Sequence, residues 1–396
     1  MNSGETEVAR RPFLTPTAVA HIAFVPTGIM TVLLGPVLPS LAARWFLNDA
    51  QAGELFTAQF LASTVGVALS GVLVPRLGYR VVLVLGLAFM ALGVGTLPLG
   101  SWALGMSSVA CYGVGLGLAI PTANLLVAEV NPDRRASALA LLNFSWSVGA
   151  VACPFLLAPF QQAERTSTFL VALGAAIASL AACMAAVSLP RPGKSADEAP
   201  TNPQSLIRLM QSPAAIVLGL LFFLYVGTES AVGGWLASYA KRIADHAGTM
   251  WVATPSFFYG ALLLGRALAP IALRHVADVK LARLGLATAV LGVVGLVSSG
   301  SLEGVVVSAC VIGLGLSAIY PITIALLSYT FGAGATRLGS VMFALAGFGG
   351  AFIPWLVGFS STQMSSLKLG LTVPLVGAAA MLALYLKAWE RTPEIS

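Results

Sequence analysis

The feature that most constrains this chain is its series of uncharged apolar segments, each about 20 residues long. Residues 167–189 contain no Asp, Glu, Lys or Arg, and residues 79–99 contain only Arg80. An α-helix needs about 20 apolar residues to cross roughly 30 Å of hydrocarbon. Membrane-spanning strands would instead alternate apolar and polar residues over segments of about 10 residues, and no such segments are seen. The runs therefore predict transmembrane helices.

Composition indicates the same environment. Hydrophobic residues make up 58% of the chain and charged residues 9%, whereas a soluble domain carries about 25% charged residues. The net charge of +6 would suit nucleic acid, but the Lys and Arg residues fall in short loops between the spans, as in membrane proteins. We therefore expect a lipid bilayer, and no nucleic acid, as partner. The four cysteines lie in apolar runs, which favours buried thiols over disulfides.

Twelve spans are predicted along the chain. They cover residues 17–41, 50–74, 79–99, 104–130, 136–160, 166–189, 213–240, 250–273, 280–300, 304–330, 336–360 and 367–389. One long hydrophilic segment, rich in Pro, Ser, Asp and Glu, separates the sixth span from the seventh and reads as a linker. The predicted units are a cytoplasmic tail (1–16), an N-terminal six-helix bundle (17–189), a cytoplasmic linker (190–212), a C-terminal six-helix bundle (213–389) and a cytoplasmic tail (390–396).

Lys and Arg are distributed unequally between the two sets of loops. The loops that share a side with the termini and the linker hold Arg10, Arg11, Arg76, Arg80, Arg134, Arg135, Arg191, Lys194, Arg208, Arg274, Lys280, Arg283, Arg337, Lys387 and Arg391. The opposite loops hold Arg44, Arg165, Lys241, Arg242 and Lys368. Because positively charged loops stay in the cytoplasm, we expect both termini to be cytoplasmic and the protein to lie in the plasma or inner membrane. The tail before the first span is polar, so no cleavable signal peptide is expected.

The two halves repeat a series of glycines and prolines at an offset of 199 or 200 residues. The matched residues are Gly28, Gly35, Gly66, Gly86, Gly93, Gly113, Gly115, Pro121, Gly149 and Pro154 with Gly227, Gly234, Gly265, Gly285, Gly292, Gly313, Gly315, Pro321, Gly349 and Pro354. Each half has six spans in the same orientation, so the repeat is parallel. Parallel repeats with a site near the bilayer midplane are one organisation of secondary transporters.

The loop after the second span carries a family motif. Its sequence, GVLVPRLGYR from Gly71 to Arg80, resembles the major facilitator signature G-x-x-x-D-R-x-G-R/K, with Pro75 at the acidic position. Residues 225–240, 313–327 and 347–358 resemble the seventh, tenth and eleventh spans of fucose-permease-like sugar symporters and related glucose transporters. The resemblance implies an all-α membrane protein of about twelve transmembrane helices in two pseudo-symmetric six-helix bundles. Unlike that branch, this chain has no acidic residue in residues 29–41 or 117–124, so a coupling carboxylate must lie elsewhere or coupling to protons is absent.

Two charged residues lie inside predicted spans, where a charge is costly. Glu229 is near the middle of the seventh span, and we predict that it couples transport to H⁺, with Na⁺ as the alternative ion. A carboxylate in apolar surroundings is costly to keep charged, which suits proton uptake and release. The alternative is a neutral carboxyl hydrogen-bonded to another helix. Arg266, in the eighth span, is predicted either to bind substrate or to pair with an acid on another helix.

Uncharged polar and aromatic side chains in the spans suit a sugar, whose hydroxyls bind amides and whose ring faces stack on Trp or Tyr. The predicted substrate-binding residues of this kind are Gln59, Asn124, Asn143, Trp146, Trp235, Tyr259 and Tyr320. Asn143 and Trp146 lie one helical turn apart on a shared face. The alternative for each residue is an interhelical contact or a lipid-facing ring.

A further set lies at the cytoplasmic ends of the spans and is predicted to take part in gating. It comprises Arg76, Gly78, Arg80, Glu129, Arg134 and Arg135. Glu129 is expected to pair with loop arginines at the membrane interface, and Glu54 has a similar interfacial role at the other end of its span. His21 is expected to be hydrogen-bonded or solvated.

These observations predict a monomeric secondary active transporter that moves a small polar solute, a sugar, by alternating access with proton coupling. A drug or metabolite exporter working by antiport is the alternative, and a sensor that binds ligand without moving it is another. The chain has no paired-histidine metal motif, no G-x-S-x-G and no G-x-x-x-x-G-K-[ST]. We therefore expect no catalytic residue, no metal and no cofactor, and neither an enzyme nor an ATP-driven pump.

Overall fold

The computed structural model describes residues 15–192, 208–244, 248 and 250–388, in which helices and short connections occur without a β-strand. Most of the predicted tails (1–16 and 390–396) and of the predicted linker (190–212) lies outside these residues. Long apolar helices dominate because backbone N–H and C=O groups in hydrocarbon must be hydrogen-bonded within the protein, and a helix achieves this within one segment.

The first half of the chain forms six spans. Its first span is bent by 44° between α1 (Pro16–Val32) and α2 (Leu34–Trp45). The helix α3 (Asp49–Thr96) contains two spans, because Gly78 breaks it with φ 82° and ψ 164°, values that an L side chain rarely adopts. The half continues with η1 (Leu97–Leu99), α4 (Trp102–Val130), η2 (Pro132–Arg134), α5 (Arg135–Gln162) and α6 (Thr166–Ala185).

The second half follows the same plan. It comprises α8 (Pro213–Ile243), η3 (Met250–Ala253), α9 (Thr254–Ala272), α10 (Asp278–Ser298), α11 (Leu302–Leu316), α12 (Ile319–Phe331), η4 (Gly332–Gly334), α13 (Ala335–Gln363), α14 (Leu367–Gly370) and α15 (Thr372–Ala388). The segment from α11 to α12 and the segment from α14 to α15 each form one apolar span. With α1–α2 as one span and α3 as two, the described residues form twelve spans, and their bounds lie within a few residues of the predicted ones.

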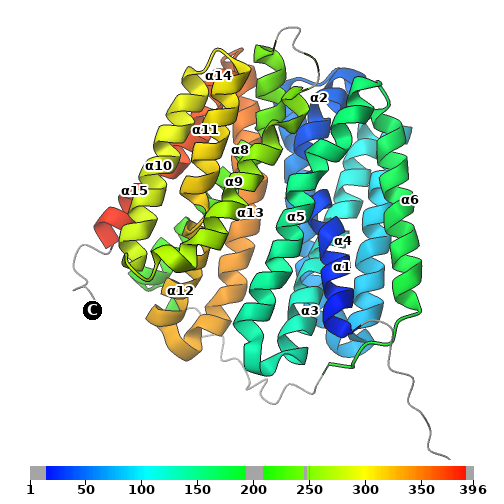
Figure 1. The fold of residues 1–396 in the computed structure, drawn as a ribbon, viewed down its shortest axis with the longest axis vertical. Coiled ribbons are helices and arrows are strands. Elements are labelled where there is room, and N and C mark those ends of the chain that lie inside the picture. The colour runs from blue at the N-terminus through cyan, green and yellow to red at the C-terminus, as the bar shows by residue number, and fades with distance from the viewer. Residues whose placement is uncertain (1–14, 193–207, 245–247, 249, 389–396) are drawn as a thin grey trace, which may run out of the picture.

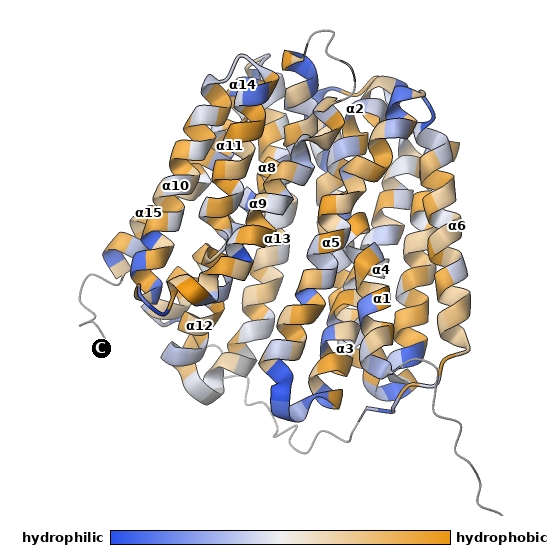
Figure 2. Cartoon of the chain, in the orientation of Figure 1, coloured by the Kyte–Doolittle hydropathy of each residue, from blue (hydrophilic) through white to orange (hydrophobic). Residues whose placement is uncertain are grey.

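The two halves lie side by side, with α1–α6 on one side of the molecule and α8–α15 on the other (Figure 1). Apolar residues cover the middle of both halves, and hydrophilic residues gather where the helices end (Figure 2). This distribution matches a bilayer, whose hydrocarbon core lies between two polar interfaces. The protein is therefore a multi-pass membrane protein.

The repeated glycines allow matching helices of the two halves to pack at the same places. A Cβ built on Gly28 would lie 1.9 Å from the carbonyl oxygen of Trp146, so α1 and α5 approach closely. In the second half, a Cβ on Gly349 would lie 1.9 Å from the carbonyl oxygen of Phe223, which brings α13 against α8. The glycine pattern read from the sequence thus marks backbone-to-backbone contacts, as small residues do at transmembrane interfaces.

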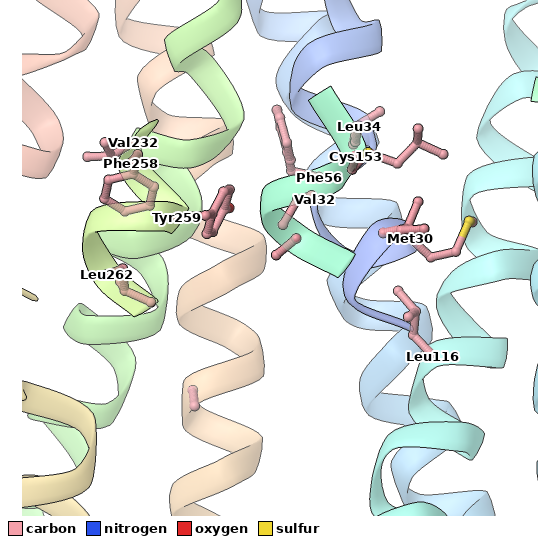
Figure 3. Packing of buried hydrophobic residues seen from close by; sticks show 14 of the residues in the cluster. Met30, Val32, Leu34, Phe56, Leu116, Cys153, Val232, Phe258, Tyr259 and Leu262 are labelled. Atoms are coloured by element: carbon pink, nitrogen blue, oxygen red, sulfur yellow. The ribbon is translucent and has the colours of Figure 1, made fainter. Parts of the chain in front are cut away.

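The two halves meet at one end of the molecule, here called the contact end, where α2 and α8 finish and α3 and η3 begin. There α3 packs on α13, α2 on α8, and α5 on α9 and η3. Trp235 is 1% exposed and lies against Phe56 of the other half, with ring centroids 6.0 Å apart. Figure 3 shows Tyr259 of the second half directed toward the first half, near Val32 and Phe56. The halves are thus joined by buried aromatic packing.

We predict that Gly28→Ala lowers the stability of the protein, because the added methyl group would overlap the backbone of α5. Overpacking of this kind costs about 1–3 kcal/mol. Gly95→Ala is the control, because a Cβ there meets no atom within 4 Å. The thermal unfolding midpoints of the purified variants in detergent measure the effect. An equal midpoint for the two variants would contradict the close approach of α1 and α5.

Candidate functional site

The charged residues of the candidate site come from two adjacent helices of the second half. Glu229 and Arg266 form an ion pair, with 3.5 Å between Oε2 and Nη2. The Arg266 guanidinium also donates a hydrogen bond to the Tyr225 hydroxyl over 3.2 Å. Tyr225 and Glu229 are four residues apart on α8 and therefore lie on one helix face. The sequence indicated that Arg266 either binds substrate or pairs with an acid, and the structure places Glu229 as that acid.

Tyrosines surround this ion pair. Tyr225 is buried, and its ring lies against that of Tyr320 from α12, with centroids 5.3 Å apart. Tyr259 lies two turns before Arg266 on α9, so both project from a similar face. Tyr259 and Tyr320, like Tyr225, lie close enough to Glu229 and Arg266 to interact electrostatically with both charges. Three of the residues predicted from the sequence, Tyr259, Tyr320 and Arg266, are thus gathered with Glu229.

Trp146 brings the first half to this cluster. Its ring makes an edge-to-face contact with Tyr259, at 6.4 Å between centroids, and its Nε1–H donates to Thr31 Oγ1 over 3.3 Å. Aromatic pairs prefer such edge-to-face arrangements. Trp146 is therefore the predicted first-half residue that touches the second-half cluster.

A neutral hydrogen-bonded network lies behind Trp146. Gln59 donates from Nε2 to the carbonyl oxygen of Thr31 over 3.0 Å, and it accepts at Oε1 from the Tyr112 hydroxyl over 3.0 Å. The Thr31 carbonyl lies beside the break between α1 and α2, where the span is bent by 44°. Gln59 is 2% exposed, so the structure places this predicted substrate-binding residue in an interhelical contact.

The remaining polar residues predicted for the substrate lie apart from these contacts. Asn124 and Asn143 each donate to the carbonyl oxygen four residues earlier in their own helix, Ile120 and Leu139. Trp235 donates from Nε1 to the carbonyl oxygen of Pro354 over 2.8 Å and is buried at the contact end. Its position is that of a packing residue between the halves.

The predicted gating residues lie at the end opposite the contact end. Gly78 forms the turn between the two spans of α3, and Arg76 and Arg80 are exposed on either side of it. The Tyr79 hydroxyl donates a hydrogen bond to the Glu129 carboxylate, which ties the start of the third span to the end of α4. Arg134 and Arg135 are exposed at the start of the fifth span.

Sequence reasoning did not single out Tyr225, Thr31 or Tyr112. Tyr225 was detectable, because it lies one turn before Glu229 on the same face. The other two were not, since a Thr and a Tyr in an apolar helix have no distinguishing pattern. Among the described residues, no group of His, Cys, Asp and Glu is suited to hold a metal ion.

A comparison with protein families identifies the chain. Residues 20–354 match the family model of the Major Facilitator Superfamily. The chain therefore belongs to the Major Facilitator Superfamily.

Known proteins similar to this chain include sugar transporters and an efflux protein. The chain is 28% identical to the rat sodium-dependent glucose transporter 1 and 24% identical to the human one, and the matches span 29% and 54% of those proteins and 35% and 62% of this chain. A glucose/galactose transporter of Brucella abortus is 25% identical over 85% of both chains. A multidrug efflux protein of Bacillus subtilis is 27% identical over 45% of this chain and 46% of its own.

Solved structures share the fold over nearly the whole chain. A bacterial homologue of the human lysosomal transporter Spinster, inward-facing and unoccupied, matches with a TM-score of 0.80 at 14% identity, over 94% of this chain and 96% of its own. The E. coli fucose:proton symporter matches with a TM-score of 0.63 at 20% identity, over 95% and 98% of the two chains. The fold predicted from the sequence, two pseudo-symmetric six-helix bundles, is confirmed.

We predict that the Glu229–Arg266 pair contributes to stability as a unit. Glu229→Gln leaves the Arg266 charge without its counter-ion, and Arg266→Gln does the same for Glu229. Each variant should therefore lower the free energy of unfolding by about 1–3 kcal/mol. This is less than the loss expected for a fully buried pair, because both side chains retain some exposure. The double variant should recover part of the loss. Thermal unfolding midpoints of the four proteins test this, and strictly additive losses would show that the two side chains do not interact.

Proposed function

We propose that this protein is a secondary active transporter that carries a sugar across the membrane by alternating access, coupled to protons through Glu229. The observation that carries the proposal is the cluster of Glu229, Arg266, Tyr225 and Tyr259 with Trp146, where the two halves meet. Glu229 is the seventeenth of the 31 residues of α8, which places the cluster near the midplane. Substrate sites of such carriers lie there, between the repeats.

The chemistry of the cluster suits a neutral, hydroxylated solute. The ion pair is electrically neutral and offers both donors and acceptors, while Trp146 and the tyrosines offer ring faces for the apolar side of a sugar. The Glu229 and Arg266 side chains are 14% and 25% exposed, so neither is completely enclosed by its neighbours. The sugar transporters among the relatives support the same substrate class.

The ion pair also supplies a mechanism for coupling. Protonation of Glu229 removes the negative charge that faces Arg266, and the guanidinium is then free to donate to a substrate hydroxyl. A proton and a sugar would thereby bind together, which is the requirement of symport. Arg266 pairs with the Glu229 carboxyl and is itself held by its hydrogen bond to the Tyr225 hydroxyl. Because one relative is sodium-dependent, Na⁺ is the alternative coupling ion.

The charge asymmetry supports an orientation. We propose that both ends of the described chain face the cytoplasm of a cell membrane, because the loops on that side carry most of the Lys and Arg. The contact end then faces outward, and the described conformation is closed to the outside. We propose that the protein acts as a monomer with the predicted N-terminal (17–189) and C-terminal (213–389) bundles as its moving parts. We also propose that substrate binding involves Asn124 and Asn143, and that the six predicted gating residues control opening of the cytoplasmic end.

The direct test is uptake of radiolabelled sugars by proteoliposomes, with and without an inward proton gradient. We expect accumulation of glucose, galactose or fucose above the equilibrium level only with the gradient. Parallel measurements replace the proton gradient with a sodium gradient. Absence of any sugar flux, together with gradient-driven extrusion of an apolar dye, would favour the exporter alternative, to which the efflux protein among the relatives is similar. Sugar binding without flux would indicate a sensor.

For Glu229→Gln we expect gradient-driven accumulation to be lost, because Gln cannot take up a proton, while sugar exchange without a gradient continues. Glu54→Gln is the matched control, since Glu54 is an exposed carboxylate on α3 outside the cluster. The ratio of accumulated to exchanged sugar separates coupling from binding. Undiminished accumulation in Glu229→Gln would remove this residue from the coupling mechanism.

For Trp146→Leu we expect the KM for sugar exchange to rise about fivefold, because an aromatic contact is worth roughly 0.5–1.5 kcal/mol. Trp102→Leu is the control, as Trp102 packs on Trp45 away from the cluster. The KM of Trp146→Phe should lie between those of Trp146→Leu and Trp102→Leu, because Phe keeps a ring but loses the hydrogen bond to Thr31. An unchanged KM in Trp146→Leu would place the substrate elsewhere.

A further inference from the structure

A second charged cluster lies at the contact end, away from Glu229, and joins the two halves. Arg242 at the end of α8 binds Asp49 at the start of α3 through two hydrogen bonds, 3.0 Å from Nη1 to Oδ2 and 2.5 Å from Nη2 to Oδ1. The Ser361 hydroxyl of α13 donates to the same carboxylate over 2.5 Å. One carboxylate of the first half thus accepts three hydrogen bonds from two helices of the second half.

The helix ends strengthen this arrangement. Asp49 is the first residue of α3, where the helix dipole favours a negative charge, and Arg242 lies in the last turn of α8, where the dipole favours a positive one. The backbone N–H of Ala50 donates a hydrogen bond to Thr362 Oγ1 over 2.8 Å. This N–H is one of those that a helix start leaves without an internal partner. Separation of α3 from α8 and α13 would therefore break several bonds at once.

An apolar layer lies deeper in the membrane than this ionic cluster. Phe56 packs on the buried Trp235, and Gly53 lets α3 approach the backbone of Trp355, where a Cβ would lie 3.0 Å from the Trp355 Cα. Apolar contacts exclude water but have little directional preference. The ionic cluster supplies the directional bonds that fix how the two halves meet.

The opposite end lacks the corresponding acid in its signature loop. Pro75 stands at the position where the motif has an acidic residue, between Gly71 and Arg76. A proline has no charge and no N–H donor, so this loop position provides no carboxylate to hold the halves closed at the cytoplasmic end. At this position the signature loop thus differs from the start of α3, where Asp49 supplies a carboxylate.

We propose that Asp49, Arg242 and Ser361 form an ionic latch that closes the contact end and holds the substrate-free protein in the conformation open to the opposite side. The role of the latch rests on the proposed alternating access. Opening the contact end requires the Asp49 carboxylate to leave both partners. The latch therefore sets how often the central cluster is exposed to the outside, without touching the solute.

The test measures access to the contact end and needs no substrate. Ser256 is 2% exposed and donates to the carbonyl oxygen of Val151 across the two halves, so Ser256→Cys provides a buried reporter thiol there. The reporter is placed in a chain whose four native cysteines are replaced by serine. Its reaction rate with a membrane-impermeant maleimide, in right-side-out vesicles, reports opening of the contact end.

We expect Asp49→Asn and Arg242→Gln each to raise the labelling rate about fivefold, because partly exposed ion pairs contribute up to about 1 kcal/mol. In the double variant Asp49→Asn with Arg242→Gln the rate should rise no further than in either single variant, because all three proteins lack the same ion pair. Glu54→Gln and Lys368→Gln are the matched controls, because both remove an exposed charge at the same end, and neither should change the rate.

Equal labelling rates in the latch variants and the controls would overturn the latch. Increases that multiply in the double variant would also overturn it, since the two side chains would then act independently and not as a pair. If the latch variants open the contact end but no sugar is transported, the latch stands and the proposed substrate fails. Sugar transport with unchanged labelling gives the reverse result, so the two proposals are judged separately.

Discussion

The hydrocarbon core of the membrane offers no water to polar groups, and the rest of this structure follows from that constraint. Each backbone N–H and C=O in the core must find a partner inside the protein, so the chain forms long helices. At one interruption of a helix, a side chain supplies a hydrogen bond. At the break between α1 and α2, the Gln59 amide donates to the carbonyl oxygen of Thr31. A polar residue in a span is therefore not by itself a sign of a substrate site.

The two halves share a packing plan but differ in chemistry. Matching glycines bring α5 onto α1 in the first half and α13 onto α8 in the second. In the first half, a hydrogen bond joins two uncharged buried side chains, Tyr112 and Gln59. The second half instead holds the Glu229–Arg266 pair. A common scaffold thus supports two kinds of interior, which is how a repeated fold acquires a single functional centre.

Contacts between the halves are of two kinds, and each kind suits a different requirement of a moving interface. The Trp235 and Phe56 rings pack without strict geometry and exclude water. The Asp49–Arg242 pair is bidentate and lies partly in solvent, with side-chain exposures of 16% and 48%. Such a pair is directional, yet its partners can be rehydrated when they separate. Together these contacts make a closed end that is specific and can still open.

The sequence by itself determined the helical class, the twelve spans and the parallel repeat. The length of the apolar segments, the charge of the loops and the spacing of the glycines can each be read from consecutive residues, and none of them depends on which helices pack together. It also marked Glu229 and Arg266, since a charge in an apolar span is conspicuous. Only the tertiary structure decided that these two residues pair, that Trp146 meets Tyr259 while Trp235 meets Phe56, and that Asp49 binds Arg242. Those outcomes depend on how distant helices approach each other, and the identity of a residue does not specify its partner across 193 positions of chain.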